Sequence, residues 1–233
     1  MNGLETNADG RTEVAGNVFA QGTIEFNDPV LIDGNLRVES ASGLVTFGST
    51  IDSSSNGQFN LTLAAPGEAE IQIEGAVGSD ALGADSNDAG LGSLTVENQV
   101  RITGGSIQTV NDQEFSQQVF IGANTTLNST GIGNITFDGD VSTVAGSPFN
   151  LSINTGLGSY FQDNPSSQLE TNGGDLTISA SDVVLEGTIN TAGGRVTFQQ
   201  TQVGSELFLG ELDGPTGPFP AEQLTFNLNG DVG

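Results

Sequence analysis

The sequence predicts an all-β fold, a parallel β-helix (β-solenoid) that forms a single domain over residues 1–233. The segment GLVTFGSTIDSSSNGQFNLTL at 43–63 returns as GNITFDGDVSTVAGSPFNLSI at 133–153, displaced by 90 positions. The segment SLTVENQVRITGGSIQT at 93–109 returns as DLTISASDVVLEGTINT at 175–191, displaced by 82. Self-similarity over such distances is typical of repeat architectures.

Short alternating strands explain why the repeats should stack. Segments of three to five residues alternate apolar and polar positions between turn residues, and each is too short to be stable alone. At ~22 residues per coil and ~4.8 Å per rung, the chain would make roughly ten short coils. A β-sandwich is the structural alternative, but it gives no reason for strand sequences to recur at displacements of 90 and 82 residues.

The elements follow in order along the chain. Residues 1–16 alternate poorly and predict an irregular first coil. Strands are expected at 23–26, 30–32, 36–38 and 44–47, and in the same order at 113–115, 119–121, 125–127 and 134–137. The stretch SDALGADSNDAGLG at 79–92 predicts a protruding loop. The units are approximately 17–109, 110–191 and an incomplete 192–233.

Recurring side chains indicate what lies inside the coils. The interior should be filled by phenylalanines, namely Phe26, Phe47, Phe115, Phe137 and Phe198. An asparagine recurs at one position of the repeat, as Asn60, Asn150 and Asn227. These asparagines are either inward groups that satisfy the backbone at turns or form short amide ladders, or else they are solvated turn residues.

Composition excludes several classes of partner and chemistry. The chain has 29 acidic residues against four arginines and no lysine, a formal charge of −25, which predicts no binding to nucleic acid and none to anionic membranes. It has no cysteine and no histidine, so disulfides, thiolate zinc sites and cysteine nucleophiles are excluded. Recurrent Val, Ile, Thr and Phe argue against disorder.

The sequence also predicts where the protein works. No segment approaches the ~18 consecutive apolar residues of a transmembrane helix, so no membrane insertion is expected, and residues 1–10 lack the features of a signal peptide. We interpret the chain as a mature or excised piece of an exported protein, located outside the cell or at its surface. The acidic, lysine-free composition, rich in Gly, Asn, Thr and Ser, suits an exposed extracellular surface.

Several segments resemble the long repeat regions of filamentous-haemagglutinin-like and autotransporter-type bacterial surface proteins. They are LVTFGSTID, NITFDGDV, QEFSQQVFIGANTTLNSTG and GSLTVEN, and the resemblance covers about Phe19 to Val203. It implies a right-handed parallel β-helix, secretion and an adhesive or structural role. The secretion-domain signatures of that family are not evident, so the chain would be an interior segment.

Paired carboxylates are the strongest hint of an enzyme, because two acids flanking a cleft hydrolyse glycosides. Asp138 and Asp140 are two positions apart, the spacing that places two side chains on the same face of a strand, and Asp85 and Asp88 lie in the long loop. The first repeat has Gly48 and Thr50 at the positions of Asp138 and Asp140. A solvated acidic turn is the simpler interpretation.

Calcium binding and ice binding stay open as alternatives, whereas phosphate binding does not. The run ADSNDAG at 84–90 is a weak calcium candidate, without an EF-hand or nonapeptide motif. Ice binding needs a flat array of threonines, and the outward Thr46, Thr136, Thr177 and Thr197 form an interrupted one. The GLGS stretches at 90–93 and 156–159 lack the context of a phosphate loop and predict turns.

The sequence therefore predicts a non-enzymatic extracellular β-solenoid, an adhesive stalk segment or a self-assembling fibre subunit. No residue is assigned a catalytic, cofactor-binding or metal-binding role. No capping helix is apparent, so head-to-tail association through the solenoid ends is expected, either in a longer rod or in filaments. A glycan or cell-surface ligand is a further candidate partner. The alternative is a polysaccharide-binding or polysaccharide-cleaving β-helix protein.

Overall fold

The structure is a computed structural model that describes residues 1–54, 59–65, 67, 69–78, 90–144, 147–209 and 224–227. Within these residues it contains strands and no helix, which confirms the all-β prediction. The strands are β1 (Leu4–Glu5), β2 (Thr12–Val14), β3 (Val18–Ala20), β4 (Ile24–Phe26), β5 (Val30–Ile32), β6 (Leu36–Ser40), β7 (Val45–Phe47), β8 (Ile51–Ser53), β9 (Leu61–Ala64), β10 (Ile71–Ile73), β11 (Leu94–Val96), β12 (Val100–Ile102), β13 (Ser106–Thr109), β14 (Gln113–Phe115), β15 (Val119–Ile121), β16 (Thr125–Ser129), β17 (Ile135–Phe137), β18 (Val141–Thr143), β19 (Leu151–Asn154), β20 (Tyr160–Gln162), β21 (Gln168–Glu170), β22 (Leu176–Ala180), β23 (Val183–Leu185), β24 (Thr188–Asn190), β25 (Val196–Gln200), β26 (Leu207–Leu209) and β27 (Leu224–Asn227).

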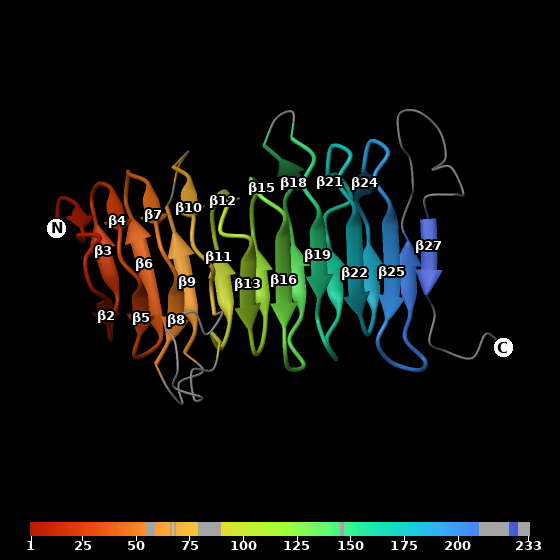
Figure 1. Ribbon diagram of the computed structural model, residues 1–233, viewed down its shortest axis with the longest axis horizontal. Coiled ribbons are helices and arrows are strands. Elements are labelled where there is room, and N and C mark those ends of the chain that lie inside the picture. The colour runs from red at the N-terminus through yellow and green to blue at the C-terminus, as the bar shows by residue number, and fades with distance from the viewer. Residues whose placement is uncertain are drawn as a thin grey trace.

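The chain winds through three parallel sheets in turn, as a right-handed parallel β-helix (Figure 1). We call one turn, with a strand in each sheet, a rung. Sheet A has the order β1-β4-β7-β10-β12-β15-β18-β21-β24, and sheet C has β3-β6-β9-β11-β14-β17-β20-β23-β26. Sheet B consists of β2-β5-β8 and β13-β16-β19-β22-β25-β27, which Val77 joins through bridges to Ile51 and Ile107.

The number of coils is slightly below the predicted ten. Sheets A and C have nine strands each, so eight full turns separate β1 from β24. Leu4 and Ile189 occupy equivalent positions in these two strands, so a turn averages about 23 positions of the chain, a period typical of repeat architectures. Individual turns vary in length: the turn from Val100 to Val119 is the shortest in sheet A, and the turn from Ile71 to Val100 is the longest.

The first coil is regular, unlike the irregular coil expected for residues 1–16. Leu4 and Glu5 of β1 pair with Ile24 and Glu25, and β2 pairs with β5 over all three of its residues. Leu4 and Val14 also pack against the core. Two- and three-residue strands contain too little alternation to be recognised in the sequence, although backbone pairing with the next rung is enough to order them.

The two copies of each long repeat lie on different sheets. The VTF triplet at 45–47 is β7 of sheet A, whereas the ITF triplet at 135–137 is β17 of sheet C. Likewise β11 of sheet C and β22 of sheet B carry the copies displaced by 82. The repeat therefore conserves the inward and outward alternation of a strand and its turn, and does not span a whole number of turns.

Stacked aromatic rings fill the interior as predicted. Phe26 and Phe47 stack with ring centroids 5.0 Å apart, and Phe115 stacks on Phe137 at the same distance. Tyr160 continues the second stack, 6.0 Å from Phe137 in an edge-on arrangement. All five predicted phenylalanines, Phe26, Phe47, Phe115, Phe137 and Phe198, are buried. Apolar residues at successive rungs thus form one continuous column.

Asparagine and aspartate side chains link successive rungs at the corners. The Oδ1 atom of Asn150 accepts a hydrogen bond from the backbone N–H of Asp175, and Asp175 Oδ1 accepts one from Arg195. Asn35 Oδ1 accepts from the N–H of Asn60 in the same way. Asn60 and Asn150 are themselves exposed. The interpretation that the asparagine satisfies a backbone group at a turn holds for Asn150, although its side chain is not inward. The side chain of Asn227 lies outside the described residues.

Glycines allow the closest approach between rungs. A Cβ atom on Gly158 would lie 2.0 Å from the carbonyl oxygen of Gly133, and one on Gly194 would lie 1.9 Å from that of Gly174. Side chains at these corners would force the rungs apart.

Residues 90–92 of the predicted loop belong to the stack, because Leu91 is buried and bridges to Thr109. Residues 79–89 of that loop lie outside the described residues.

Candidate functional site

Asp138 and Asp140, the described pair of acidic residues considered for catalysis, lie in a turn and take part in hydrogen bonds between rungs. Asp138 and Asp140 follow β17 in the turn that leads to β18, not on a strand face. Asp140 Oδ1 accepts a hydrogen bond from the N–H of Gln168, and the backbone carbonyl of Asp138 accepts one from Asn164 Nδ2. This arrangement is that of corner residues that join rungs.

The metal hypothesis receives no support from the described part of the chain. Asp85, Asp88 and nearly all of the 84–90 segment lie outside it. Among the described residues, no group of three or more Asp and Glu side chains is arranged to hold a metal ion. The same residues contain no helix long and apolar enough to cross a membrane.

Arg11, Arg37 and Arg101 are engaged by neighbouring carboxylates. Arg37 donates to both carboxylate oxygens of Glu97 at 2.7 Å and to Glu39 at 2.8 Å. These hydrogen bonds hold the pKa of the Glu97 carboxyl below its usual range and raise the pKa of the Arg37 guanidinium. Arg101 pairs with both oxygens of Glu70 and lies over the ring of Phe120. Such pairs leave these cations little capacity for an anionic partner.

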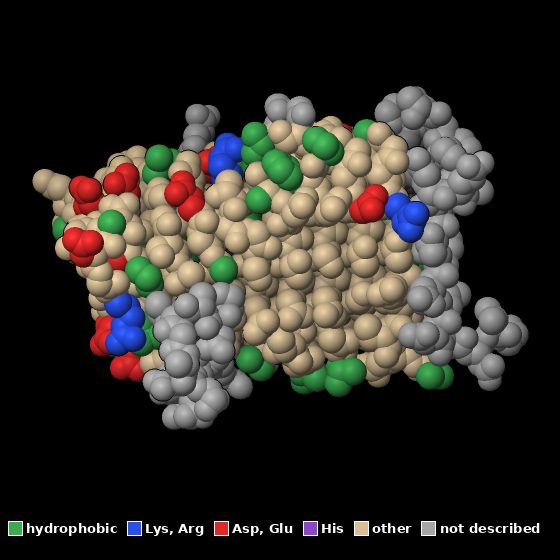
Figure 2. Space-filling view, viewed as in Figure 1, with side chains coloured by type: hydrophobic (Ala, Val, Ile, Leu, Met, Phe, Trp, Pro, Cys, Tyr) green, Lys and Arg blue, Asp and Glu red, His purple; other side chains and the backbone are tan. Residues whose placement is uncertain are grey.

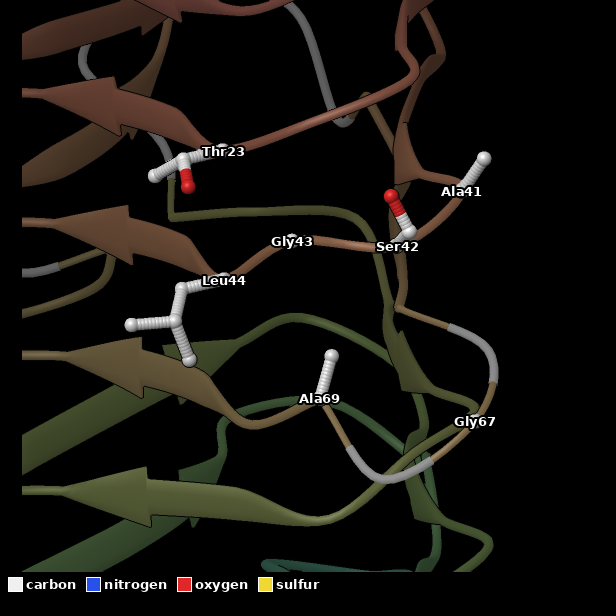
Figure 3. A pocket seen from close by; sticks show the side chains of 7 residues that line it. All are labelled: Thr23, Ala41, Ser42, Gly43, Leu44, Gly67 and Ala69. Atoms are coloured by element: carbon white, nitrogen blue, oxygen red, sulfur yellow. The ribbon is translucent and has the colours of Figure 1, made fainter.

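One depression at a corner of the solenoid lacks acid–base groups. It is shallow, with a volume of about 550 Å³, and lies at the corner between sheets C and A (Figure 3). Its lining consists of small and aliphatic residues, namely Thr23, Ala41, Ser42, Gly43, Leu44, Gly67 and Ala69. A second depression, of about 260 Å³, lies over Asn17, Asn35 and Asn60. Neither has the paired carboxylates of a glycoside hydrolase.

The outer face of sheet B carries a regular column of hydroxyl groups. Each of the five strands β13, β16, β19, β22 and β25 places a serine or threonine at the same outward position. Strand register aligns these residues one above another, as Ser106, Thr126, Ser152, Thr177 and Thr197. Parallel strands lie ~4.8 Å apart, so the hydroxyls repeat at that interval.

A second column runs beside the first, two residues further along each strand. It contains amides and one hydroxyl, as Gln108, Asn128, Asn154, Ser179 and Gln199. Asn128 Nδ2 donates to Gln108 Oε1 at 3.3 Å, and Ser179 Oγ donates to Gln199 Oε1 at 2.8 Å. These bonds fix side chains between rungs. We call the ten residues of the two columns the polar face.

The polar face contains no charged side chain, although the protein carries 29 acidic residues. The five strands face the viewer in Figure 1, and the same area of Figure 2 is almost entirely free of red and blue. Asp175 and Arg195 come one position before β22 and β25, at the edge of the face. Charge is thus confined to its border.

An exposed aliphatic ridge borders the polar face at the corner between sheets B and C. Ile132, Leu157 and Val203 are 74%, 57% and 80% exposed. Their turns stack on one another, because Leu157 N donates to Gly131 O and Gln202 Nε2 donates to Leu157 O. Exposed apolar groups gathered in this way often mark a contact surface.

Comparison with known proteins leaves the site to be interpreted from its own geometry. No protein-family model, curated protein or solved structure matches the chain significantly. The resemblance to bacterial surface-protein repeats therefore stays a prediction.

The sequence identified only part of the polar face. Thr177 and Thr197 belong to it, but Thr46 is on sheet A and Thr136 on sheet C. The hydroxyl column was hidden because its members recur at unequal intervals along the chain. Corner lengths set these intervals, so strand register was needed to align Ser106, Thr126 and Ser152 with the two threonines.

Proposed function

We propose that the protein is a non-enzymatic, extracellular structural or adhesive β-solenoid, a stalk segment or a fibre subunit. The supporting observation is the uninterrupted register of its rungs, from β1 to β24 in sheet A, around one apolar column. A solenoid of this kind presents fixed outer faces at regular intervals. Acidic side chains at the corners accept hydrogen bonds from backbone N–H groups of neighbouring rungs, and this structural use favours a scaffold over a catalyst.

Assembly would proceed through the open edge of the first rung. Leu4 N and Thr6 N donate to Thr23 O and Glu25 O of the second rung. The N–H of Glu5, which lies between them, points away from the second rung because bonding alternates along a parallel strand. Such an edge is a template for another strand, supplied here by a second copy or by a longer rod.

If the protein assembles through the open edge of the first rung, the backbone N–H of Glu5 should control filament length. Glu5→Pro removes the outward N–H and leaves the bonds made by Leu4 and Thr6, whereas Glu5→Gln retains the N–H and removes the same charge. Negative-stain electron microscopy should show end-to-end filaments for the wild type and Glu5→Gln, and short rods for Glu5→Pro. A monodisperse population of short rods for all three chains, at every concentration, would reject assembly through this edge.

The enzymatic alternative is tested separately with neutral and acidic polysaccharides. Incubation should release no new reducing ends and no unsaturated products. If products appear and are lost in Asp138→Asn or Asp140→Asn, the protein is a polysaccharide-cleaving enzyme and the structural proposal fails.

A further inference from the structure

We propose that the polar face of sheet B binds ice, by ordering a layer of water that joins the ice lattice. This inference does not depend on assembly through the solenoid ends. Its basis is the unbroken pair of columns on β13, β16, β19, β22 and β25, which carry a hydrogen-bonding group at each of ten outward positions.

The spacing of the face is that of a two-dimensional lattice. Rungs repeat at ~4.8 Å, and outward residues two apart on a strand are separated by about 6.7 Å. Five rungs therefore give a patch about 19 Å long in which every spacing repeats. Intervals of this order also separate equivalent water oxygens on the surfaces of hexagonal ice. A single glycan chain or a protein loop in solution has no such fixed two-dimensional period.

The face is also rigid. Threonine is stiff at χ1 because it is β-branched, and the first column has threonine at three of its five positions. In the second column, the bonds from Asn128 to Gln108 and from Ser179 to Gln199 hold side chains between rungs. Side chains that are already fixed lose little further entropy when water is ordered upon them, so the main entropic cost is that of immobilising the water.

The absence of charge on the face distinguishes water from other ligands. An ionised carboxylate or ammonium orients its own hydration shell and breaks the lattice, and the face carries none. A sugar chain would have to displace water from these hydroxyls and amides, with a loss that must be recovered elsewhere. The ten outward positions hold no aromatic ring on which a sugar could stack. With ice as the ligand, each polar group keeps a water partner.

The bordering ridge supports the same ligand. Ile132, Leu157 and Val203 extend along the corner beside the polar face, and their exposed apolar surface is without charge. In one molecular account of the hydrophobic effect, first-shell water next to apolar groups has restricted orientational freedom. The ridge thus extends the area over which the first hydration layer resembles a solid.

Partition into slowly growing ice tests the proposal. The fluorescently labelled wild-type chain should be enriched several-fold in the ice fraction over a non-binding globular protein, and it should inhibit recrystallisation. Ser152→Asp places one charge at the centre of the face and should abolish both effects. Thr136→Asp, which makes a comparable outward change on sheet C, should retain them. Circular dichroism and melting temperature verify that both variants fold.

A second pair of variants, both uncharged, separates the contribution of the hydroxyl group from that of the side-chain shape. Thr126→Val keeps the shape and removes the hydroxyl, and Thr126→Ser keeps the hydroxyl, so ice partition should fall more in the first. Exclusion of the wild type from ice would overturn the proposal. So would ice partition that Ser152→Asp leaves unchanged. Binding to an insoluble neutral polysaccharide, lost in Ser152→Asp and without ice enrichment, would assign the face to a glycan instead.

Discussion

Tyr160 is the single tyrosine of the chain, and its phenol is fully buried in the aromatic stack. Its hydroxyl has no hydrogen-bond partner among the described residues. Burial disfavours the charged phenolate and raises the pKa of Tyr160 well above its ordinary value. Below the ordinary pKa of ~10 the buried phenol contributes its full stability, and this contribution is lost as the pH rises beyond it.

The buried phenol makes a prediction that absorbance spectroscopy checks directly. Since the chain lacks tryptophan, phenolate absorbance reports Tyr160 alone. It should stay absent through pH ~10 and appear together with loss of circular dichroism, whereas the chain in denaturant should titrate near ~10. Reversible ionisation near pH ~10 in the folded protein would show that Tyr160 is solvated.

Gly158 illustrates a requirement set by the backbone of a neighbouring rung. Gly158→Ala would bring a Cβ atom to 2.0 Å from Gly133 O, and relief of this overlap should cost about 1–3 kcal/mol of the free energy of unfolding. Gly16→Ala is the matched control, because no atom lies within 4 Å of its Cβ position. Chemical denaturation should show the first variant destabilised and the second nearly unchanged. Equal stabilities would mean that the rungs separate easily at this corner.

Phenylalanines were the residues most readily predicted from sequence, and asparagines less so. A large apolar side chain in an alternating strand has one favourable location, so the five phenylalanines were correctly expected inside. An asparagine at a turn satisfies its hydrogen bonds in several ways. The bond from Asp175 N to Asn150 Oδ1 depends on which corner lies above Asn150, and sequence periodicity does not contain that information.

At the scale of elements, an ion pair connects strands of sheet C that are not neighbours. Arg37 on β6 reaches Glu97, directly after β11, across the intervening β9. The Arg37 hydrogen bonds depress the pKa of Glu97. A carboxyl with a depressed pKa contributes stability above its unfolded value, and this is lost as the pH falls through its folded value. Because the pair is partly exposed, we expect a small effect on stability.

NMR titration of the Glu97 carboxyl measures this coupling. Its pKa should lie below the ordinary glutamate value and rise toward it in Arg37→Gln. Arg101→Gln removes a cation from sheet A and should leave the Glu97 pKa unchanged. A Glu97 pKa that does not respond to Arg37→Gln would show that the side chains are apart in solution.

Repeats were informative about strands but not about their sheets. The copies at 45–47 and 135–137 were correctly expected to form strands with the same inward residues. Their placement on sheets A and C reflects variable corner lengths, which make some turns much longer than others. Any of the three sheets accepts the same alternating strand, so sequence similarity alone did not define the rung or reveal the polar face.

The whole molecule is a rod with chemically distinct faces. The chain carries 29 acidic residues and four arginines, and none of them occupies one of the ten positions of the polar face. Solenoid architecture makes this separation simple, because each outward column is set by one position per turn. The coil count was predicted well because the coil length expected from sequence is close to the average turn between β1 and β24.

Small-angle X-ray scattering over a range of concentrations tests the central claim, a β-solenoid rod that extends through its ends. At low concentration the scattering should fit an elongated particle, with about 38 Å from β1 to β24 at ~4.8 Å per rung. With rising concentration the length should increase while the cross-sectional radius stays constant, and Glu5→Pro should suppress the increase. A compact, nearly spherical particle, or growth of the cross-section with concentration, would contradict the account.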